Sequence, residues 1–324
     1  MVQRKNVSII VPAYNEEKNI VPLFERIKEL VKKDKKRKYE VVLVDDGSTD
    51  GTYREGKKIE KKYSWVRVVR HRKNMGKTEA ILTGLENSEG EILVILDADL
   101  QYDPLEIPLL LDKMEEGYDI VTGWKKGKYE KKFVSWVYNL LSRILFRIPV
   151  HDQNAIKALK REVLEEINLR KDWHRYIVSL AVDKGFKAGE VPVTLHPRLY
   201  GESKYRGKGR IVIGLLDLIS VKFQVSFMKK PMLLFGTAGG ISLILGVLVG
   251  IYAIIMRFVF HHGYRPLLYL VTLLVLAGLL LFVMGFLAEA ICFLGERFER
   301  LERELKGDKE TLSGTRKGKT KARR

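Results

Sequence analysis

The chain has a single cysteine, Cys292, among its 324 residues, so a disulfide within the chain is excluded. No zinc-finger, homeodomain or RNA-recognition signature is present, and the lysines are spread along the chain. The net charge of +18 therefore does not indicate a nucleic-acid partner. No internal repeat is evident. The first apolar run is short and resembles a strand, so we expect no signal peptide.

Charge is missing from one long segment, Pro231 to Met256, and a second apolar run covers Leu267 to Ala288. Each run exceeds the roughly 20 residues that a helix needs to cross a bilayer. The link 257–266 is short, so the two runs predict a helical hairpin. Lysine and arginine gather outside both ends of the hairpin, whereas the link carries only Arg257 and Arg265. The positive-inside rule then predicts a cell-membrane protein with two spans, whose large domain and C-terminal tail are cytoplasmic.

Composition divides the chain into four parts. Residues 1–206 are predicted to form a charge-rich globular domain, and 207–230 to form interfacial amphipathic helices. Residues 231–296 contain the two-span hairpin, and 297–324 form a basic tail. The tail has few apolar residues from Lys306 onward, which predicts disorder there.

Strand and helix patterns alternate over the first half of the chain. This alternation predicts an α/β fold with a mostly parallel sheet flanked by helices. The expected strands are Val7–Val11, Glu40–Val44, Val66–Val69, Ile92–Leu96 and Asp119–Thr122, and the expected helices are Glu16–Lys33, Thr52–Tyr63, Lys77–Asn87, Pro104–Glu116 and Lys131–Phe146. The segments Ala155–Leu159, Arg161–Ile167, His174–Lys184 and Ala188–Thr194 continue the fold with a less regular order.

The buried-strand pattern Ile92–Leu96 ends in two acids, Asp97 and Asp99, with Gln101 close behind. Open α/β sheets bind ligands at the carboxyl ends of their strands. Two carboxylates so close together repel each other unless a cation lies beside them. A hard divalent cation holding a phosphorylated substrate meets that need. The alternative is a pair of exposed acids in an ordinary loop.

Three other predicted strand ends carry residues suited to a nucleotide. In the motif V-P-A-Y-N-E, Pro12 stops the strand, Tyr14 can stack on a base and Glu16 can accept a hydrogen bond from a ribose hydroxyl. In V-D-D-G-S-T-D-G-T, Asp46 suits a base N–H. Lys77 begins a predicted helix, where free backbone N–H groups favour phosphate. The glycine spacing of a P-loop is missing.

Together, V-P-A-Y-N-E, V-D-D-G-S-T-D-G-T and D-A-D-L-Q resemble the family 2 glycosyltransferases, which have a GT-A fold. The resemblance narrows to the polyprenyl-phosphate glycosyltransferases, typified by dolichol-phosphate mannose synthase. It covers Val7 to Lys204, and a hairpin after the domain is common in the group. It implies an inverting, metal-dependent transfer of one sugar from a nucleotide-diphosphate sugar, with guanine or uracil as the base, to dolichyl or undecaprenyl phosphate.

The resemblance also implies roles for residues at matching positions. Pro12, Tyr14, Glu16 and Asp46 would hold the base and ribose, Asp97 would lie beside the nucleotide, and Asp99 with Gln101 would bind Mg²⁺ or Mn²⁺ bridging the diphosphate.

Five further residues match the family's phosphate-handling and acceptor segments. Arg198 and Lys204 match a mobile loop that contacts the donor diphosphate. Lys125 stands where many relatives have the arginine of G-S-R and would meet the acceptor phosphate, and Lys131 aligns near another basic position. Asp152 matches the acid of a D-x-x-S-G segment, but the glycine of that segment is missing here.

Two absences favour the transfer of one sugar per turnover. The Q-x-x-R-W motif of processive polysaccharide synthases is absent, and two spans are too few for a polymer channel. One competing hypothesis is transfer to a neutral lipid alcohol such as diacylglycerol or ceramide, with Asp152 as the base. Another is a non-catalytic nucleotide-sugar-binding subunit, which the presence of both Asp99 and Gln101 disfavours. The sugar, the base and the existence of a homo-oligomer stay open.

Overall fold

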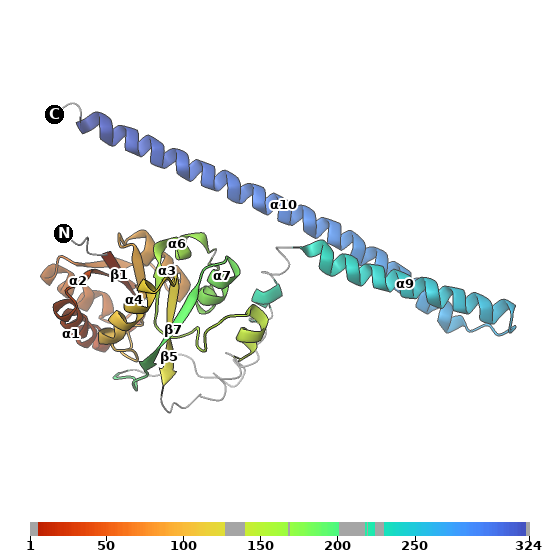
Figure 1. Ribbon diagram of the computed structural model, residues 1–324, viewed down its shortest axis with the longest axis horizontal. Coiled ribbons are helices and arrows are strands. Elements are labelled where there is room, and N and C mark those ends of the chain that lie inside the picture. Colours follow the sequence, from red (N-terminus) through yellow and green to blue (C-terminus); the bar gives the residue numbers. More distant parts are fainter. Residues whose placement is uncertain are drawn as a thin grey trace. The chain divides into compact units, whose positions relative to one another are not determined.

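The computed structural model describes residues 6–126, 140–167, 169–200, 218, 220–223 and 230–321. The chain forms two compact units, Met1–Leu216 and Asp217–Arg324 (Figure 1). The predicted boundary at 206/207 falls outside the described residues, as does most of the predicted interfacial segment 207–230. That division therefore stays a prediction.

The first unit contains a seven-stranded sheet in the order β3-β2-β1-β4-β6-β5-β7. The strands are β1 (Asn6–Ala13), β2 (Lys38–Asp45), β3 (Val66–Arg70), β4 (Ile92–Ile95), β5 (Ile120–Lys126), β6 (Lys157–Lys160) and β7 (Ala188–Thr194). Neighbouring strands are parallel except at β6, which runs antiparallel to both β4 and β5. The predicted mostly parallel sheet is confirmed.

Helices flank this sheet, and those at 17–33, 52–62, 77–86 and 104–115 lie where they were predicted. Most of the predicted helix Lys131–Phe146 lies outside the described residues. The helices are α1 (Glu17–Lys33), α2 (Thr52–Lys62), α3 (Lys77–Glu86), η1 (Pro104–Glu106), α4 (Ile107–Glu115), α6 (Arg161–Glu166), η2 (Trp173–Tyr176) and α7 (Ile177–Asp183). The expected helix Pro104–Glu116 is thus a short 3₁₀ turn followed by an α-helix. Asp103 accepts a hydrogen bond from the Leu105 N–H and caps that turn.

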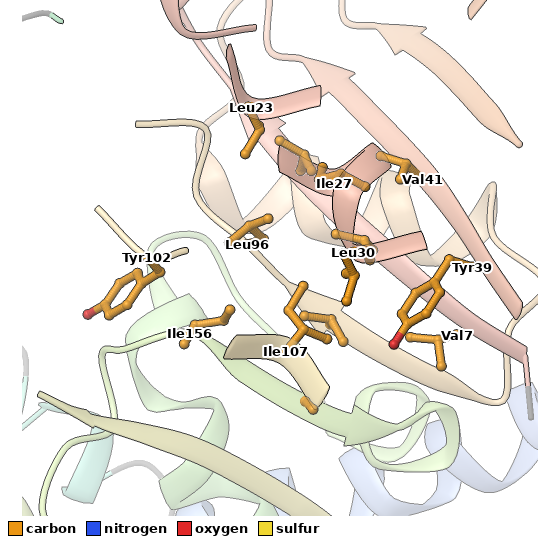
Figure 2. Close-up of a cluster of buried hydrophobic side chains, with 14 of the residues drawn as sticks. Val7, Leu23, Ile27, Leu30, Tyr39, Val41, Leu96, Tyr102, Ile107 and Ile156 are labelled. Carbon is orange, nitrogen blue, oxygen red and sulfur yellow. The ribbon is translucent and has the colours of Figure 1, made fainter. Parts of the chain in front are cut away.

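The two faces of β1 bury different helices because successive side chains of a strand point to opposite faces. Val7 and its alternate neighbours join a cluster with Leu23, Ile27 and Leu30 of α1 (Figure 2). The spacing of these three leucine and isoleucine positions gives α1 one continuous apolar face. On the other face, a Cβ on Gly84 of α3 would lie 2.3 Å from Ile10, so α3 can approach the strand only with glycine there. Helices therefore cover both faces of the sheet.

The second unit is built from two long apolar helices, α9 (Pro231–Phe258) and α10 (Arg265–Lys321). The candidate membrane spans are Pro231–Phe258 and Arg265–Gly295, with mean hydropathies of 2.3 and 2.8. Only 11% and 6% of their most apolar windows are buried. Exposed apolar surface of this extent favours lipid over water as the surrounding medium.

Small residues bring α9 and α10 into contact. A Cβ on Gly239 would lie 2.8 Å from the Gly278 carbonyl oxygen, and one on Gly278 would lie 2.9 Å from the Gly239 carbonyl. Close backbone approach at small residues is the usual means of helix association in lipid. Glu289 on α10 accepts a hydrogen bond of 3.3 Å from the Met232 N–H in the first turn of α9. The predicted hairpin is thus held at both its middle and its end.

The predicted disorder from Lys306 onward is wrong, because α10 continues to Lys321. The tail has no proline, and it follows directly from an apolar helix. It can therefore extend the existing hydrogen-bond ladder without a new helix nucleus.

Candidate active site

The loops that follow β1 and β2 are bound to each other at the carboxyl edge of the sheet. Asn15 N donates to Ser48 Oγ at 2.9 Å, and Asn15 Oδ1 accepts from Thr49 N at 2.9 Å. Glu16 N donates to Thr52 Oγ1 at 2.8 Å. Asn15 has a φ of 52°, which is uncommon for a residue other than glycine. These contacts fix the V-P-A-Y-N-E turn, which carries Tyr14 and Glu16, in one backbone conformation.

Asp46 is almost fully buried, and its carboxylate holds the loop before α3. Oδ1 accepts from Met75 N at 2.8 Å and lies 2.7 Å from His71 Nδ1, and Oδ2 accepts from Gly76 N at 2.8 Å. The carboxylate thereby connects the end of β2 to the start of α3. A contact between Asp46 and a base or ribose stays a prediction.

Lys77, the first residue of α3, forms an ion pair with Asp97 at the end of β4. Burial works against ionisation of Asp97, but the Lys77 ammonium outweighs it and holds the pKa of that carboxyl below its usual range. A lysine at a helix N-terminus, beside free backbone N–H groups, is suited to phosphate. The predicted residues Lys77 and Asp97 are therefore brought together.

Asp99 lies two residues further on and is largely buried, with a side chain 13% exposed. Its Oδ1 accepts from Gln101 N at 3.2 Å, and its Oδ2 accepts from Arg198 Nε at 3.0 Å. Burial, and then the charge of Asp97, raise the pKa of Asp99. Leu100 has a φ of 56°, a strained backbone conformation of a kind that clusters at functional sites. A cation beside Asp99 would offset its desolvation and the repulsion from Asp97.

The donor set suits a metal ion that a substrate helps to coordinate. Over the described residues, no group of three or more His, Cys, Asp and Glu side chains is placed to hold an ion alone. Mg²⁺ is commonly bound by one or two carboxylates plus phosphate oxygens. Asp99, with Asp97 and Gln101 beside it, fits that pattern.

The segment after β7 connects three parts of the site. His196 N donates to the Gln101 carbonyl at 2.9 Å, Arg198 contacts Asp99, and the Tyr200 carbonyl accepts from Asn19 Nδ2 of α1 at 3.4 Å. The predicted phosphate-binding loop thus begins next to D-A-D-L-Q. Its other predicted cation, Lys204, lies outside the described residues.

The predicted acceptor residues Lys125 and Asp152 form an ion pair, with 3.1 Å between Nζ and Oδ2. The Asp152 side chain is 3% exposed, its Oδ1 accepts from Asn154 N at 2.9 Å, and its carbonyl accepts from Thr122 Oγ1 at 2.9 Å. These contacts place the Lys125 ammonium at the end of β5. Lys131 lies outside the described residues.

Sequence reasoning missed two buried basic residues near these pairs. Lys157 is the first residue of β6 and is 6% exposed, and burial followed by the charge of Lys77 lowers its pKa to about 8. Burial also lowers the pKa of His174 to about 2, and its Nδ1 lies 3.1 Å from Thr78 Oγ1. A lysine within an apolar strand was the available signal for Lys157. For His174 no sequence signal was available.

A pocket of about 590 Å³ lies elsewhere, between the end of α1 and η1. Arg37, at this pocket, is bound by Asp34, Asp112 and Glu115, at 3.0, 2.6 and 2.8 Å. These ion pairs compensate the charge of Arg37 and fix the start of β2. The role of Arg37 at this pocket is therefore structural.

The model of glycosyl transferase family 2 matches residues 8–167. The dodecaprenyl-phosphate galacturonate synthase of Rhizobium johnstonii is 32% identical over 301 residues, which cover 90% of this chain and 88% of that protein. The undecaprenyl-phosphate 4-deoxy-4-formamido-L-arabinose transferase of Pseudomonas aeruginosa is 29% identical, over 87% of this chain and 84% of the relative. The dolichol-phosphate mannosyltransferase of Pyrococcus furiosus is 34% identical over a shorter stretch, 62% of this chain and 60% of that protein.

Among solved structures, the glucosyl-3-phosphoglycerate synthase of Mycobacterium tuberculosis, in complex with Mn²⁺, UDP-glucose and phosphoglyceric acid, has a TM-score of 0.53 to this chain. The match covers 68% of this chain and 79% of that one at 21% identity. At this identity the likeness concerns the fold, which agrees with the predicted GT-A architecture.

Proposed function

Because the chain belongs to glycosyl transferase family 2, we propose that it is a membrane-anchored inverting glycosyltransferase. It moves a single sugar from a nucleotide-diphosphate sugar to a polyprenyl phosphate. The relatives named above use dodecaprenyl, undecaprenyl or dolichol phosphate, and the first of them matches nearly the whole chain. The two candidate spans supply the membrane attachment that such a lipid acceptor requires.

One observation carries the proposal: two lysine–aspartate pairs lie at the same edge of one sheet. Lys77–Asp97 lies at the end of β4, and Lys125–Asp152 lies at the end of β5, with only β6 between these strands. A nucleotide diphosphate at the first pair and a lipid phosphate at the second would meet across that edge. Positioning of this kind accounts for much of the catalysis of group transfer.

On the donor side, Lys77 and the N–H groups at the start of α3 would bind phosphate, and Pro12, Tyr14, Glu16 and Asp46 the nucleoside. Asp99 and Gln101 would hold Mg²⁺ or Mn²⁺, which when bound supplies positive charge to the leaving diphosphate. Arg198, released from Asp99, would contact the same diphosphate. Lys204 would add a second cation on the same loop.

On the acceptor side, the attacking phosphate is already an anion and needs little help from a general base. Lys125 would hold it beside the donor, with Asp152 fixing the lysine, and Lys131 would assist. An alcohol acceptor would need Asp152 as a base. Its carboxylate is 3% exposed and already bound by Lys125, which favours the phosphate acceptor.

The lysine-rich flanks of the hairpin favour a cytoplasmic domain and tail. Cys292 is the one cysteine, so a Cys292→Ser background lets a single new cysteine report its side of the membrane. A cysteine in place of Ser64 should be protected from an impermeant thiol reagent in intact cells, and one in place of His262 should react. The reverse pattern would reject this orientation.

The central test incubates the purified full-length protein with labelled GDP- and UDP-sugars. The lipids are dolichyl phosphate, undecaprenyl phosphate, diacylglycerol and ceramide, each with Mn²⁺, Mg²⁺ or EDTA. Label should move to a polyprenyl phosphate only when metal is present, and the reactive donor identifies the base and the sugar. Label on diacylglycerol or ceramide alone would reject the proposed acceptor. Full cellular function of Asp99→Ala would favour the non-catalytic subunit.

A further inference from the structure

Lys157 occupies a central place at the carboxyl edge of the sheet. Because β6 runs antiparallel to its neighbours, its first residue lies beside the last residue of β4 and beside the last β5 residue that pairs with β6. Lys157 pairs with Ile95 on β4 and with Thr122 on β5. Asp97 follows Ile95 by two positions, and Lys125 follows Thr122 by three. Lys157 therefore stands between the two lysine–aspartate pairs.

The charges around Lys157 are compensated, but its own charge is not. Asp97 is bound by Lys77, and Asp152 by Lys125. Across the described parts of the chain, no carboxylate lies within ion-pair distance of the Lys157 ammonium. The charges of Asp97 and Asp152 act to raise the pKa of Lys157, whereas the charges of Lys77 and Lys125 act to lower it. Lys157 is 6% exposed and has no counter-ion among the described residues, and burying such a charge lowers the stability of the fold. A ligand that binds the charge would explain why the chain has a lysine there.

We propose that Lys157 binds a phosphate oxygen of a substrate, between the donor diphosphate and the acceptor phosphate. This inference rests on the proposed function. The recognised chemistry is a phosphoryl anion, and lysine binds one as a compact point charge. The anion supplies the counter-charge that the protein leaves out. In the free protein the Lys157 ammonium has no counter-ion from the part of the chain that the structure describes, and the phosphate of the bound substrate would become that counter-ion.

A purely structural role predicts a different arrangement. Lys160, at the other end of β6, illustrates it: its ammonium lies 2.7 Å from Asp119, and its side chain is 46% exposed. That lysine is paired and solvated, whereas Lys157 is neither. Lys160→Met is therefore a matched control, on the same strand and with the same chemical change, outside the site.

The experiment uses the full-length protein in detergent and the variants Lys157→Met, Lys157→Arg and Lys160→Met. Calorimetry measures the Kd of the nucleoside diphosphate of the active donor with Mn²⁺, and separately the Kd of a short-chain polyprenyl phosphate. Lys157→Met should weaken one of them by about 10- to 100-fold, as loss of a charged hydrogen bond does, and Lys160→Met should change neither by more than about twofold. Weaker nucleotide binding assigns Lys157 to the donor, and weaker lipid binding assigns it to the acceptor.

A pH series gives a readout that a packing role would not move. In the wild type, affinity for that ligand should fall as the pH rises past about 8, because the free lysine loses its proton there. Lys157→Arg, which stays charged, should keep its affinity to higher pH. The arginine variant also keeps the inference testable if Lys157→Met does not fold. If the affinity of Lys157→Arg falls above pH 8 as steeply as the affinity of the wild type does, the inference is overturned.

The inference and the proposed function can fail separately. If the wild type forms a lipid-linked sugar and a folded Lys157→Met binds both ligands as the wild type does, Lys157 is not a phosphate ligand and the function stands. If the wild type binds neither phosphate and transfers no sugar, the proposed function fails and takes this inference with it.

Discussion

Arg198 Nε donates a 3.0 Å hydrogen bond to Asp99 Oδ2, although 99 positions separate the two residues in the chain. The guanidinium therefore lies against the carboxylate that is proposed to hold the metal. It compensates the charge of Asp99 in the free protein. Under this proposal a metal ion and Arg198 would compete for one carboxylate, and the diphosphate would offer Arg198 a second partner.

Arg198→Met should have opposite effects on metal binding and on turnover. Without its competitor, Asp99 should bind Mn²⁺ several-fold more tightly in the absence of nucleotide, as measured by electron paramagnetic resonance. Turnover should fall by at least about 10-fold, because the leaving diphosphate loses a cation. Arg26→Met, which removes the partner of Asp103, should change neither. Weaker Mn²⁺ binding in Arg198→Met would contradict the competition.

Asp99→Asn should remove the metal dependence of donor binding. The amide keeps the shape of the side chain but carries no charge, so the ion would lose the carboxylate ligand proposed for it. We expect kcat/KM to fall by at least about 100-fold, a loss of roughly 2.7 kcal/mol or more in transition-state stabilisation. Titration of nucleotide with and without EDTA measures the first effect. Asp119→Asn, which changes a carboxylate bound by Lys160, is the control and should keep its activity.

Lys125→Met should raise the KM for polyprenyl phosphate by about 10-fold or more and leave nucleotide affinity unchanged. It also leaves the buried Asp152 carboxylate without its ion-pair partner, so the melting temperature should fall. The double variant Lys125→Met/Asp152→Asn separates the two effects: it should recover stability but not the KM. A recovered KM in the double variant would show that Lys125 acts only by neutralising Asp152.

His174 should make the fold less stable in mild acid. Burial lowers its pKa from 6.5 to about 2, so the unfolded chain binds a proton that the folded one does not between these values. Stability is therefore full above about pH 6.5 and declines as the pH falls. Between pH 7.5 and 5 the loss is about 2 kcal/mol from this residue. His174→Gln should flatten the pH dependence of the melting temperature over this range, and an unchanged slope would show that His174 is not kept neutral by the fold.

Gly239→Leu should separate the two apolar helices. A Cβ at this position would already lie 2.8 Å from the Gly278 carbonyl, so a larger side chain forces the backbones apart. We expect a lower melting temperature in detergent and faster proteolysis at the link. The neighbouring Gly240 has nothing within 4 Å of a built Cβ, so Gly240→Leu should behave like the wild type. Equal effects of the two variants would argue against this packing.

The order of strands and helices could be predicted from the sequence because local patterns determine it. Short apolar runs placed β1 and β2, and the amphipathic pattern placed α1, within two residues of their observed ends. The sequence placed Lys77 at a helix start and Asp97 at a strand end of the same sheet edge, and the ion pair between them is seen only in the structure. Local rules sufficed wherever a residue's neighbours came from its own strand and the next helix.

The rest depended on contacts between distant segments. The reversed direction of β6 brings Lys157 to the active edge, and no local pattern shows that direction. The Arg198–Asp99 contact needs the segment after β7 to return to the end of β4. Asp46 was assigned to the nucleotide from its motif, but its three partners in the loop before α3 could be seen only in three dimensions.

The hydrogen bond from Met232 N to Glu289 has a consequence for biogenesis. The carboxylate satisfies an N–H group that the first turn of α9 cannot pair within its own helix. A carboxylate carried alone into the bilayer is costly, as is an unpaired N–H group. Glu289 follows Met232 by 57 positions, so the ribosome must complete most of the second candidate span, Arg265–Gly295, before either cost is relieved. The insertion machinery therefore gains most by releasing the two helices to the lipid together.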